Sequence, residues 1–345
     1  MFLEPLRVRP GARFTCHGDG LCCTDVHALG PLDEAAVLTL TVIDENVVTE
    51  YEGESFLSHA DDGGCVFLGD DGCAIHATLG GESKPAACQQ FPFALVATPV
   101  GGRVATRHYC PCRTMGEREP LEASAALAVS PPGAADRTIR NMLPFAGDEA
   151  IDLAKWERLE GGLLERLAAG EAPETVLDAP PYSTPNKGSW EVLCRAMLEE
   201  TGPSRFEAAG CAFALTVLRA LGEEAAPIPV PMPWADAFDR AEARSDEGSA
   251  DAMLADWVAD VLWSLEWAFF GTFEQARFFG TFEQARRDLA TRVDVARRIA
   301  RELPGRADRT MAEAIAVVEL VGMGENYQSF IGDLADLGEP ADPSD

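Results

Sequence analysis

Cysteine is the residue type in this chain that is best placed to do chemistry. Eight of the ten cysteines and all five histidines fall within residues 1–112 of the 345-residue sequence. Those cysteines are Cys16, Cys22, Cys23, Cys65, Cys73, Cys88, Cys110 and Cys112. Thiolates bind soft and borderline metals such as zinc and iron. We therefore expect a metal site in the first third of the chain and take these eight residues as its candidate ligands.

Disulfide bonds are the ordinary alternative use of so many cysteines. The charged residues Glu4, Arg7 and Arg9 stand where a secretory signal needs an uninterrupted apolar core. No segment has the length of uncharged apolar residues that spans a bilayer. We therefore expect a cytoplasmic protein that is not inserted in a membrane, in which the thiols stay reduced and are free for metal binding or catalysis.

Four short motifs carry a resemblance to a known family. They are FTCHGDGLCC at 14–23, CVFL at 65–68, CAIH at 73–76 and KPAACQQFP at 84–92. In this order they resemble the YkgJ-type cysteine-cluster family, which is described as a zinc- or iron-chelating domain. The resemblance covers about residues 14 to 93 and implies that the six cysteines in these motifs occupy family positions.

The motifs depart from the family pattern in three places. The family usually has another cysteine between the first cysteine and the Cys-Cys pair, where this chain has only residues 17–21. The family's tyrosine is His76 here, and its arginine-proline step is Lys84 and Pro85. Cys110 and Cys112 lie beyond the core motif and could supply ligands lost elsewhere. Which four thiols bind metal is therefore left open.

The spacing of the cysteines bears on the kind of metal. Structural zinc is usually held by two close pairs of ligands, each pair two to four residues apart. This chain has no Cys-x-x-Cys step, and its cysteines come from widely separated loops, which suits an iron-sulfur cluster held by four thiolates. The similar flagellin lysine methylases are associated with such a cluster. We expect an iron-sulfur cluster, of the [4Fe–4S] type, with zinc or a single iron ion as the alternative.

The function that follows is metal binding, and whether the protein is an enzyme stays open. One alternative is a methyltransferase similar to the flagellin lysine methylases, which would use S-adenosylmethionine. The sequence has neither a dinucleotide-type glycine-rich turn nor a radical-type Cys-x-x-x-Cys-x-x-Cys motif to support it. A second alternative is a purely structural zinc site. Nucleophilic catalysis by Cys16 with His17 is disfavoured, because adjacent side chains rarely point at each other. No catalytic or cofactor-binding residue is assigned.

Several residues near the motifs are expected to support the site without binding metal. Three histidines are expected to be hydrogen-bonding neighbours of the ligands: His17, His76 and His108. Three cations could neutralise thiolate charge: Lys84, Arg107 and Arg113. The remaining cysteines, Cys194 and Cys211, lie among apolar residues at helical spacing and are expected to be small core residues.

The elements around the cysteines are predicted to be short. Clusters of glycine and aspartate place most of the thiols on loops and turns. A short helix is predicted over residues 32–40. The apolar runs 91–100 and 104–109 flank Gly101 and Gly102 and predict a β-hairpin, with Cys88 before it and Cys110 after it.

The rest of the chain is predicted to be helical. Apolar residues recur at helical spacing in 148–169, 189–201, 203–221, 235–244, 249–270, 282–303, 309–321 and 327–337. The predicted fold class is α+β for a small, irregular, cysteine-rich metal-binding domain, followed by an all-α helical domain. The predicted boundaries are 1–118 for the metal-binding domain, 119–135 for a linker, 136–338 for the helical domain and 339–345 for an acidic tail.

Charge limits the class of partner. The formal net charge is −29, which would repel nucleic acid and anionic membrane surfaces. We expect a protein or small-molecule partner for the helical domain, of a kind that the sequence does not identify. The segment FFGTFEQAR occurs twice in succession, at 269–277 and 278–286. We interpret this repeat as a recent duplication, absorbed in a loop or kink at Gly271 and Gly280, and not as a functional motif.

Overall fold

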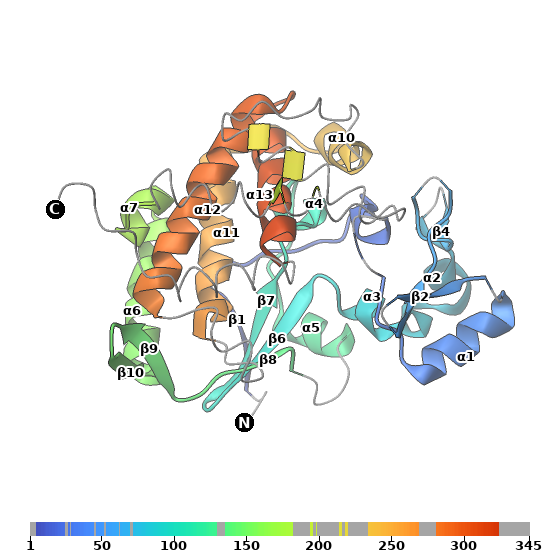
Figure 1. Cartoon of the computed structure of the whole chain (residues 1–345), viewed down its shortest axis with the longest axis horizontal. Coiled ribbons are helices and arrows are strands. Elements are labelled where there is room, and N and C mark those ends of the chain that lie inside the picture. Colours follow the sequence, from blue (N-terminus) through green and yellow to red (C-terminus); the bar gives the residue numbers. More distant parts are fainter. Residues whose placement is uncertain are drawn as a thin grey trace.

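The computed structural model describes most of the chain. The described residues are 5–24, 27, 29–44, 46–51, 53–61, 63–69, 72–129, 135–181, 194–195, 198, 214–215, 218–219, 234–268 and 281–323. Figure 1 shows a small lobe, a central sheet and a group of longer helices on the far side of the sheet from that lobe. The predicted helices at 189–201, 203–221 and 327–337 lie largely or wholly outside the described residues.

The central sheet has four strands in the order β1-β7-β6-β8. Their bounds are β1 Leu6–Val8, β6 Phe93–Thr98, β7 Gly101–Thr106 and β8 Arg137–Thr138. β6 and β7 are antiparallel and form the predicted hairpin, which the structure confirms, while β1 joins β7 and β8 joins β6 in parallel. Every residue of β6 and β7 is buried, because other elements cover both faces of the sheet.

The helical part packs against one face of this sheet (Figure 1). Its helices are α6 Leu153–Ala168, α7 Pro173–Leu177, α10 Ala235–Ala243, α11 Ala250–Trp263, α12 Phe282–Glu302 and α13 Ala307–Met323, with the 3₁₀ turn η3 Glu266–Ala268 after α11. The predicted helices at 235–244, 282–303 and 309–321 are confirmed in position, whereas the helix predicted over 249–270 ends at Trp263 and is followed by a turn and η3. Side chains of Ser249 and Thr281 cap the first turns of α11 and α12, as N-cap residues should.

The prediction of an all-α region over residues 136–338 is wrong at its start. β8 belongs to the central sheet, and β9 Met142–Ala146 pairs with β10 Glu149–Asp152 in a separate antiparallel hairpin. The helix predicted from residue 148 therefore begins only at Leu153, where the Asp152 carboxylate accepts the Lys155 backbone N–H at 2.6 Å. The fold is mixed α/β with a helical C-terminal region.

Short elements build the small lobe, which we call the N-terminal lobe (residues 29–90). They are α1 Glu34–Ile43, β2 Val48–Tyr51, β3 Glu54–Leu57, β4 Leu68–Gly69, β5 Gly72–Cys73, α2 Ala74–Leu79, η2 Gly81–Ser83 and α3 Ala86–Gln90. Two hairpins, β2-β3 and β4-β5, pack with α1 around a small apolar cluster that includes Leu40, Leu57 and Ile75. The predicted helix after Pro31 is confirmed as α1, two residues later than expected.

The connections between lobe and helices carry three more short elements: η1 Leu21–Cys23, α4 Pro111–Thr114 and α5 Ala123–Val129. Leu21 and Met115, which adjoin the cysteine motifs, belong to the same apolar core as Trp156 and Trp257 of the helices. The segments that carry the candidate ligands are therefore packed directly against the helical part. Among the described residues, no helix combines the length and apolar composition needed to cross a membrane.

Glu319 on α13 is a buried carboxyl group near this contact. Its two oxygens accept the Tyr109 backbone N–H at 2.7 Å and the Trp257 indole N–H at 3.0 Å. Burial raises the pKa of Glu319 to about 7, although Arg107 and the two hydrogen bonds oppose the shift. The folded state therefore keeps a proton that the unfolded chain loses near its ordinary carboxyl pKa.

This raised pKa gives a pH prediction. Between about pH 4.5 and 7 the native state binds more protons than the unfolded state, so the contribution of Glu319 to stability falls as pH rises through that window. In denaturant titrations, the wild type should lose stability between pH 5 and pH 8 by an amount on the order of 3 kcal/mol because of Glu319. Glu319→Gln should not show this loss. Glu283→Gln, at an exposed position on α12, is the matched control and should follow the wild type. An equal effect of Glu319→Gln at both pH values would contradict the prediction.

Candidate metal centre

The eight candidate cysteines lie where the N-terminal lobe meets the rest of the molecule. All nine cysteines within the described residues have free thiols. Cys16 is exposed, Cys65, Cys110 and Cys112 are buried, and the other four candidates are partly buried. The ninth, Cys194, is fully buried in the helical core as predicted, and Cys211 lies outside the described residues. The candidates thus come from six separate segments of the chain.

The vicinal cysteines occupy the one-turn helix η1. Two backbone hydrogen bonds give this turn its 3₁₀ geometry. The Cys23 N–H donates to the Gly20 carbonyl at 2.9 Å, and the Thr24 N–H donates to the Leu21 carbonyl at 3.2 Å. Gly20 precedes this turn with φ 84°, and a Cβ there would lie 3.2 Å from an Arg240 nitrogen, so only glycine fits without strain. The turn places the Cys22 and Cys23 sulfurs 3.9 Å apart.

Four thiols gather inside the N-terminal lobe, and we call them the lobe group: Cys23, Cys65, Cys73 and Cys88. All four pack into the apolar cluster of the lobe. The Cys65 backbone N–H donates to the Cys23 carbonyl at 2.7 Å, and Cys73 pairs with Leu68 across the β4-β5 hairpin. Backbone contacts therefore tie together three of the four segments that carry these thiols.

The protonation of the lobe group reflects this packing. Burial raises the pKa of Cys88 to about 12 and that of Cys65 to about 11, and in both cases the nearby Cys23 and Cys73 thiols add to the increase. Cys23 differs, because its interaction with the Cys22 thiol and the charge of Lys84 lower its pKa to about 7. Clustered thiols resist losing several protons unless a cation compensates for the charge.

The other four thiols lie between the lobe and the helices, and we call them the junction group: Cys16, Cys22, Cys110 and Cys112. The Cys112 sulfur accepts the His17 backbone N–H at 3.2 Å, which fixes it beside the segment of Cys16. The hydrogen bond to the Cys110 thiol raises the pKa of Cys112 to about 12, with burial adding to it. The interaction with Cys23, burial and the nearby thiols of Cys110 and Cys16 raise the pKa of Cys22.

Asp19 links the junction group to the helical part, a role that no sequence motif predicted. Its side chain is buried, and its carboxylate accepts the Cys112 S–H at 3.2 Å and the Arg244 guanidinium at 2.5 and 2.9 Å. Arg240 donates to the Asp19 carbonyl oxygen at 2.6 and 3.0 Å. The last turn of α10 and its C-cap residue thus hold the loop between Cys16 and Cys22 in place.

The cations near the motifs interact with two kinds of partner, thiols and carboxylates. Lys84 lies close enough to Cys23 to lower its pKa, as the prediction of a neutralising cation requires. Arg113 instead binds Asp256 and Asp260 of α11, both at 2.6 Å, and does not serve the thiols. His108 Nε2 donates to the Asp260 carboxylate at 2.8 Å and so is a hydrogen-bonding neighbour, although of a carboxylate and not of a candidate ligand.

Two other neighbours are also accounted for. His17 Nε2 lies 2.9 Å from the Glu117 carbonyl oxygen, which is consistent with its predicted role as a hydrogen-bonding residue. Arg107 is buried near Tyr109, Glu266 and Glu319, so its charge is directed to the helical part. Two of the three predicted cations, Arg107 and Arg113, therefore belong to the interface with the helices.

The donor set suits a metal bound by sulfur, although the side chains do not converge on one point. Within the described residues, no three His, Cys, Asp or Glu side chains stand in the arrangement of a formed metal site. A single zinc ion draws four ligands to one centre. The cysteines of an iron-sulfur cluster bind to different iron atoms of one larger group. The described thiols are spread over two groups, and the Asp19 carboxylate contacts one of them through Cys112.

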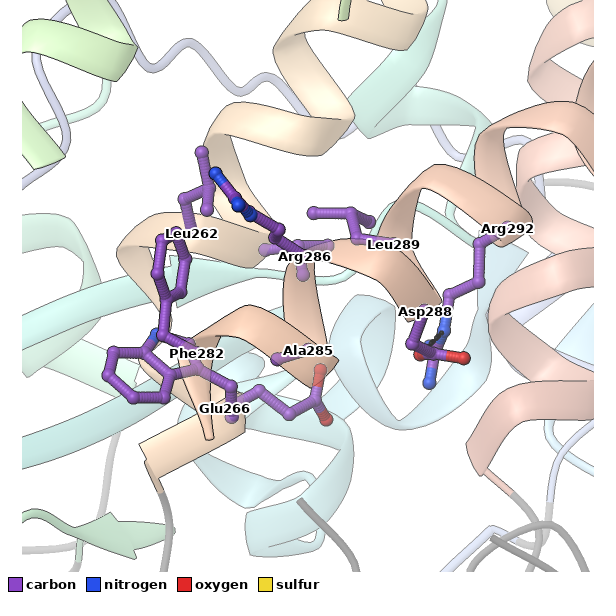
Figure 2. A pocket seen from close by; sticks show the side chains of 10 residues that line it. Leu262, Glu266, Phe282, Ala285, Arg286, Asp288, Leu289 and Arg292 are labelled. Atoms are coloured by element: carbon purple, nitrogen blue, oxygen red, sulfur yellow. Dashed lines mark hydrogen bonds and ion pairs between the residues drawn. The ribbon is translucent and has the colours of Figure 1, made fainter. Parts of the chain in front are cut away.

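The structure also has a hollow far from the cysteines, formed by α11, η3 and α12. Its cavity volume is about 30 Å³, which is room for about two water molecules. Figure 2 shows Phe282 toward one side and Asp288 with Arg292 toward the other. Asp288 pairs with Arg292 at 2.8 Å, and Glu266 pairs with Arg137 at 2.7 Å. Three of its charged groups, Glu266, Asp288 and Arg292, are thus already in ion pairs, so the hollow does not compete with the cysteines as the candidate site.

The duplicated segment borders this hollow. In its second copy, Thr281 caps α12 and Gln284 bonds back to the Thr281 backbone, so the segment begins a helix. The first copy and Gly280 lie outside the described residues.

No family model matches this chain, and no curated protein or solved structure shows significant similarity to it.

Proposed function

We propose that this protein binds a metal through its N-terminal thiols, and that the metal is iron in an iron-sulfur cluster. The observation that carries the proposal is the presence of eight free thiols on six segments of the chain, four of which pack into one cluster of the lobe. Apolar packing does not account for so many partly buried thiols, because the lobe core already contains larger apolar side chains. A bound cation would remove the electrostatic cost of ionising them.

The chain's own residues would do two things for such a group. The thiolates would hold it, and Lys84 with the nearby backbone would offset part of the negative charge of the site. The packing of α4 against α10 and α13 would shield Cys110 and Cys112 from water. A bound cluster would supply one-electron redox chemistry, with a potential set by its charge and exposure.

Metal and sulfide analysis tests this proposal. The protein is purified without oxygen, and iron, zinc and acid-labile sulfide are measured in one sample together with its absorption spectrum. We expect brown protein with a broad band near about 400 nm and matched amounts of iron and sulfide. Cys194→Ala is the control, because its thiol lies in the helical core, and it should keep the full metal content. Stoichiometric zinc without colour would replace the cluster by zinc, and protein without metal would overturn the proposal.

A further inference from the structure

Helix α1 of the N-terminal lobe carries apolar side chains on two opposite sides. Ala36 and Leu40, one turn apart, pack into the apolar cluster of the lobe, and Leu40 is buried. Leu38 and Val42, also one turn apart, are 62% and 86% exposed. Successive residues of an α-helix are turned by about 100°, so Leu38 lies roughly opposite Leu40. A helix that is apolar all round is normally buried all round, whereas one side of α1 is open to solvent.

Exposed apolar side chains are concentrated in this lobe. Of the nine large apolar side chains that are exposed among the described residues, five lie in the lobe and three of these, Leu38, Val42 and Ile43, belong to α1. We call these three residues the outer face of α1. Figure 1 shows α1 at the outer edge of the lobe, away from the long helices. Single exposed apolar residues are ordinary, but a contiguous group of them marks a contact surface.

Charge indicates what kind of partner fits the outer face. The lobe contains twelve aspartate and glutamate residues and one lysine, which gives it a net charge of −11. Glu34 lies one turn before Leu38 on the same side of the helix, and Asp33 and Asp44 are exposed at its two ends. A surface that combines apolar and cationic side chains would complement both features. An amphipathic helix with lysine or arginine on its polar side is such a surface.

The same charge disfavours two other occupants. A second copy of the chain would bring another lobe of charge −11 against the first, and the two would repel each other. Residues 324–345 contain six acidic residues and neither lysine nor arginine, so this segment of the chain is repelled by the lobe as well. A basic partner is the occupant that charge favours.

We propose that the outer face of α1 is the docking site for a basic amphipathic helix of another protein. The apolar side of that helix would cover Leu38, Val42 and Ile43, and its cations would lie near Glu34 and the acidic ends of α1. This inference goes beyond the proposed function, because α1 contains none of the eight candidate thiols.

Peptide titration tests the docking site. The probe is a synthetic helical peptide of about 18 residues with leucine on one side and lysine on the other. A peptide with glutamate in place of lysine is its control. At about 0.15 M ionic strength, we expect calorimetry to show saturable binding of about one lysine peptide per chain and no binding of the glutamate peptide. Leu38→Ser with Val42→Ser should weaken binding by at least about tenfold, because apolar contact area is lost.

The matched control variant is Val100→Ser with Leu127→Ser. These two side chains are 52% and 45% exposed but lie outside the lobe, so the variant should bind the lysine peptide like the wild type. Far-ultraviolet circular dichroism checks that both paired variants remain folded. The docking site would be overturned by equal affinities of the two paired variants, or by a wild type that binds no peptide. Equal binding of the two peptides would overturn the preference for a basic partner.

Two further measurements on the wild type and on Leu38→Ser with Val42→Ser distinguish other occupants. Analytical ultracentrifugation detects self-association, and co-sedimentation with phosphatidylcholine vesicles detects binding to a lipid surface. We expect neither in the wild type. A dimer that the paired substitution dissociates would assign the outer face to a second copy, and vesicle binding that it abolishes would assign the face to a lipid surface. Either result would overturn the proposal.

Discussion

Asp260→Ala is expected to lower the free energy of unfolding by about 3–5 kcal/mol. Asp260 is buried in α11 and accepts hydrogen bonds from Arg9 at 2.5 Å, Arg113 at 2.6 Å and Thr106. Burial alone would raise its pKa, but Arg113 and Arg9 hold the pKa well below the usual range. Removing the carboxylate leaves buried cations with too little compensating charge, which is the costly way to break a buried ion pair.

Equilibrium unfolding in urea measures this effect. Asp251→Ala is the matched control, because Asp251 lies on the same helix with 75% of its side chain exposed and pairs with Arg297 at the surface. We expect the control to change stability by less than about 1 kcal/mol. Because the Asp260 pKa is lowered, its stabilisation is present above the unfolded carboxyl pKa and is lost as pH falls through the folded value. A loss in Asp260→Ala no larger than in the control would contradict the prediction.

Arg103→Leu, at a second buried ion pair, should lower the free energy of unfolding by a comparable amount. Arg103 in β7 is fully buried, and its guanidinium donates to Glu160 at 2.7 Å and to the Trp263 carbonyl oxygen at 3.2 Å. Leucine would fill the space but leave the Glu160 carboxylate buried without its cation. We expect the free energy of unfolding to fall by about 3–5 kcal/mol.

The sheet supplies the control for this second prediction. Arg7 in β1 stands directly opposite Arg103 and binds Glu157, but 38% of its side chain is exposed. Arg7→Leu should therefore cost less than about 1 kcal/mol in the same urea titration. Similar losses in the two variants would mean that burial does not determine the cost, and the prediction would be wrong.

Much of the secondary structure could be predicted because its signals are local. Apolar runs around Gly101 and Gly102 identified the β6-β7 hairpin, and helical spacing located the start of α11 within one residue but not its end at Trp263. β9 and β10 were missed because β10 continues without a break into the apolar pattern of α6. Asp152, a good N-cap immediately before Leu153, was the available sign that the helix starts later.

The candidate site could be predicted only as a set of residue types. The motifs identified eight thiols, but which of them lie side by side depends on how the segments that carry them pack together, which spacing does not encode. The network around Asp260 was missed because its partners lie 147 and 251 residues away in the sequence. Asp256 and Asp260, four residues apart in an otherwise apolar helix, were a usable sign that buried cations exist elsewhere.

The pairing of Arg9 with Asp260 also has a consequence for synthesis of the chain. The two residues are separated by 251 positions, and Arg9 leaves the ribosome first. At about 5–20 residues per second, translation needs on the order of ten to fifty seconds to bring Asp260 to its partner. During that interval Arg9 has no carboxylate partner from α11. The same is true of Arg113 once it has left the ribosome. The nascent thiols of Cys110 and Cys112 are therefore accessible to solvent until the helices that pack on α4 have been synthesised.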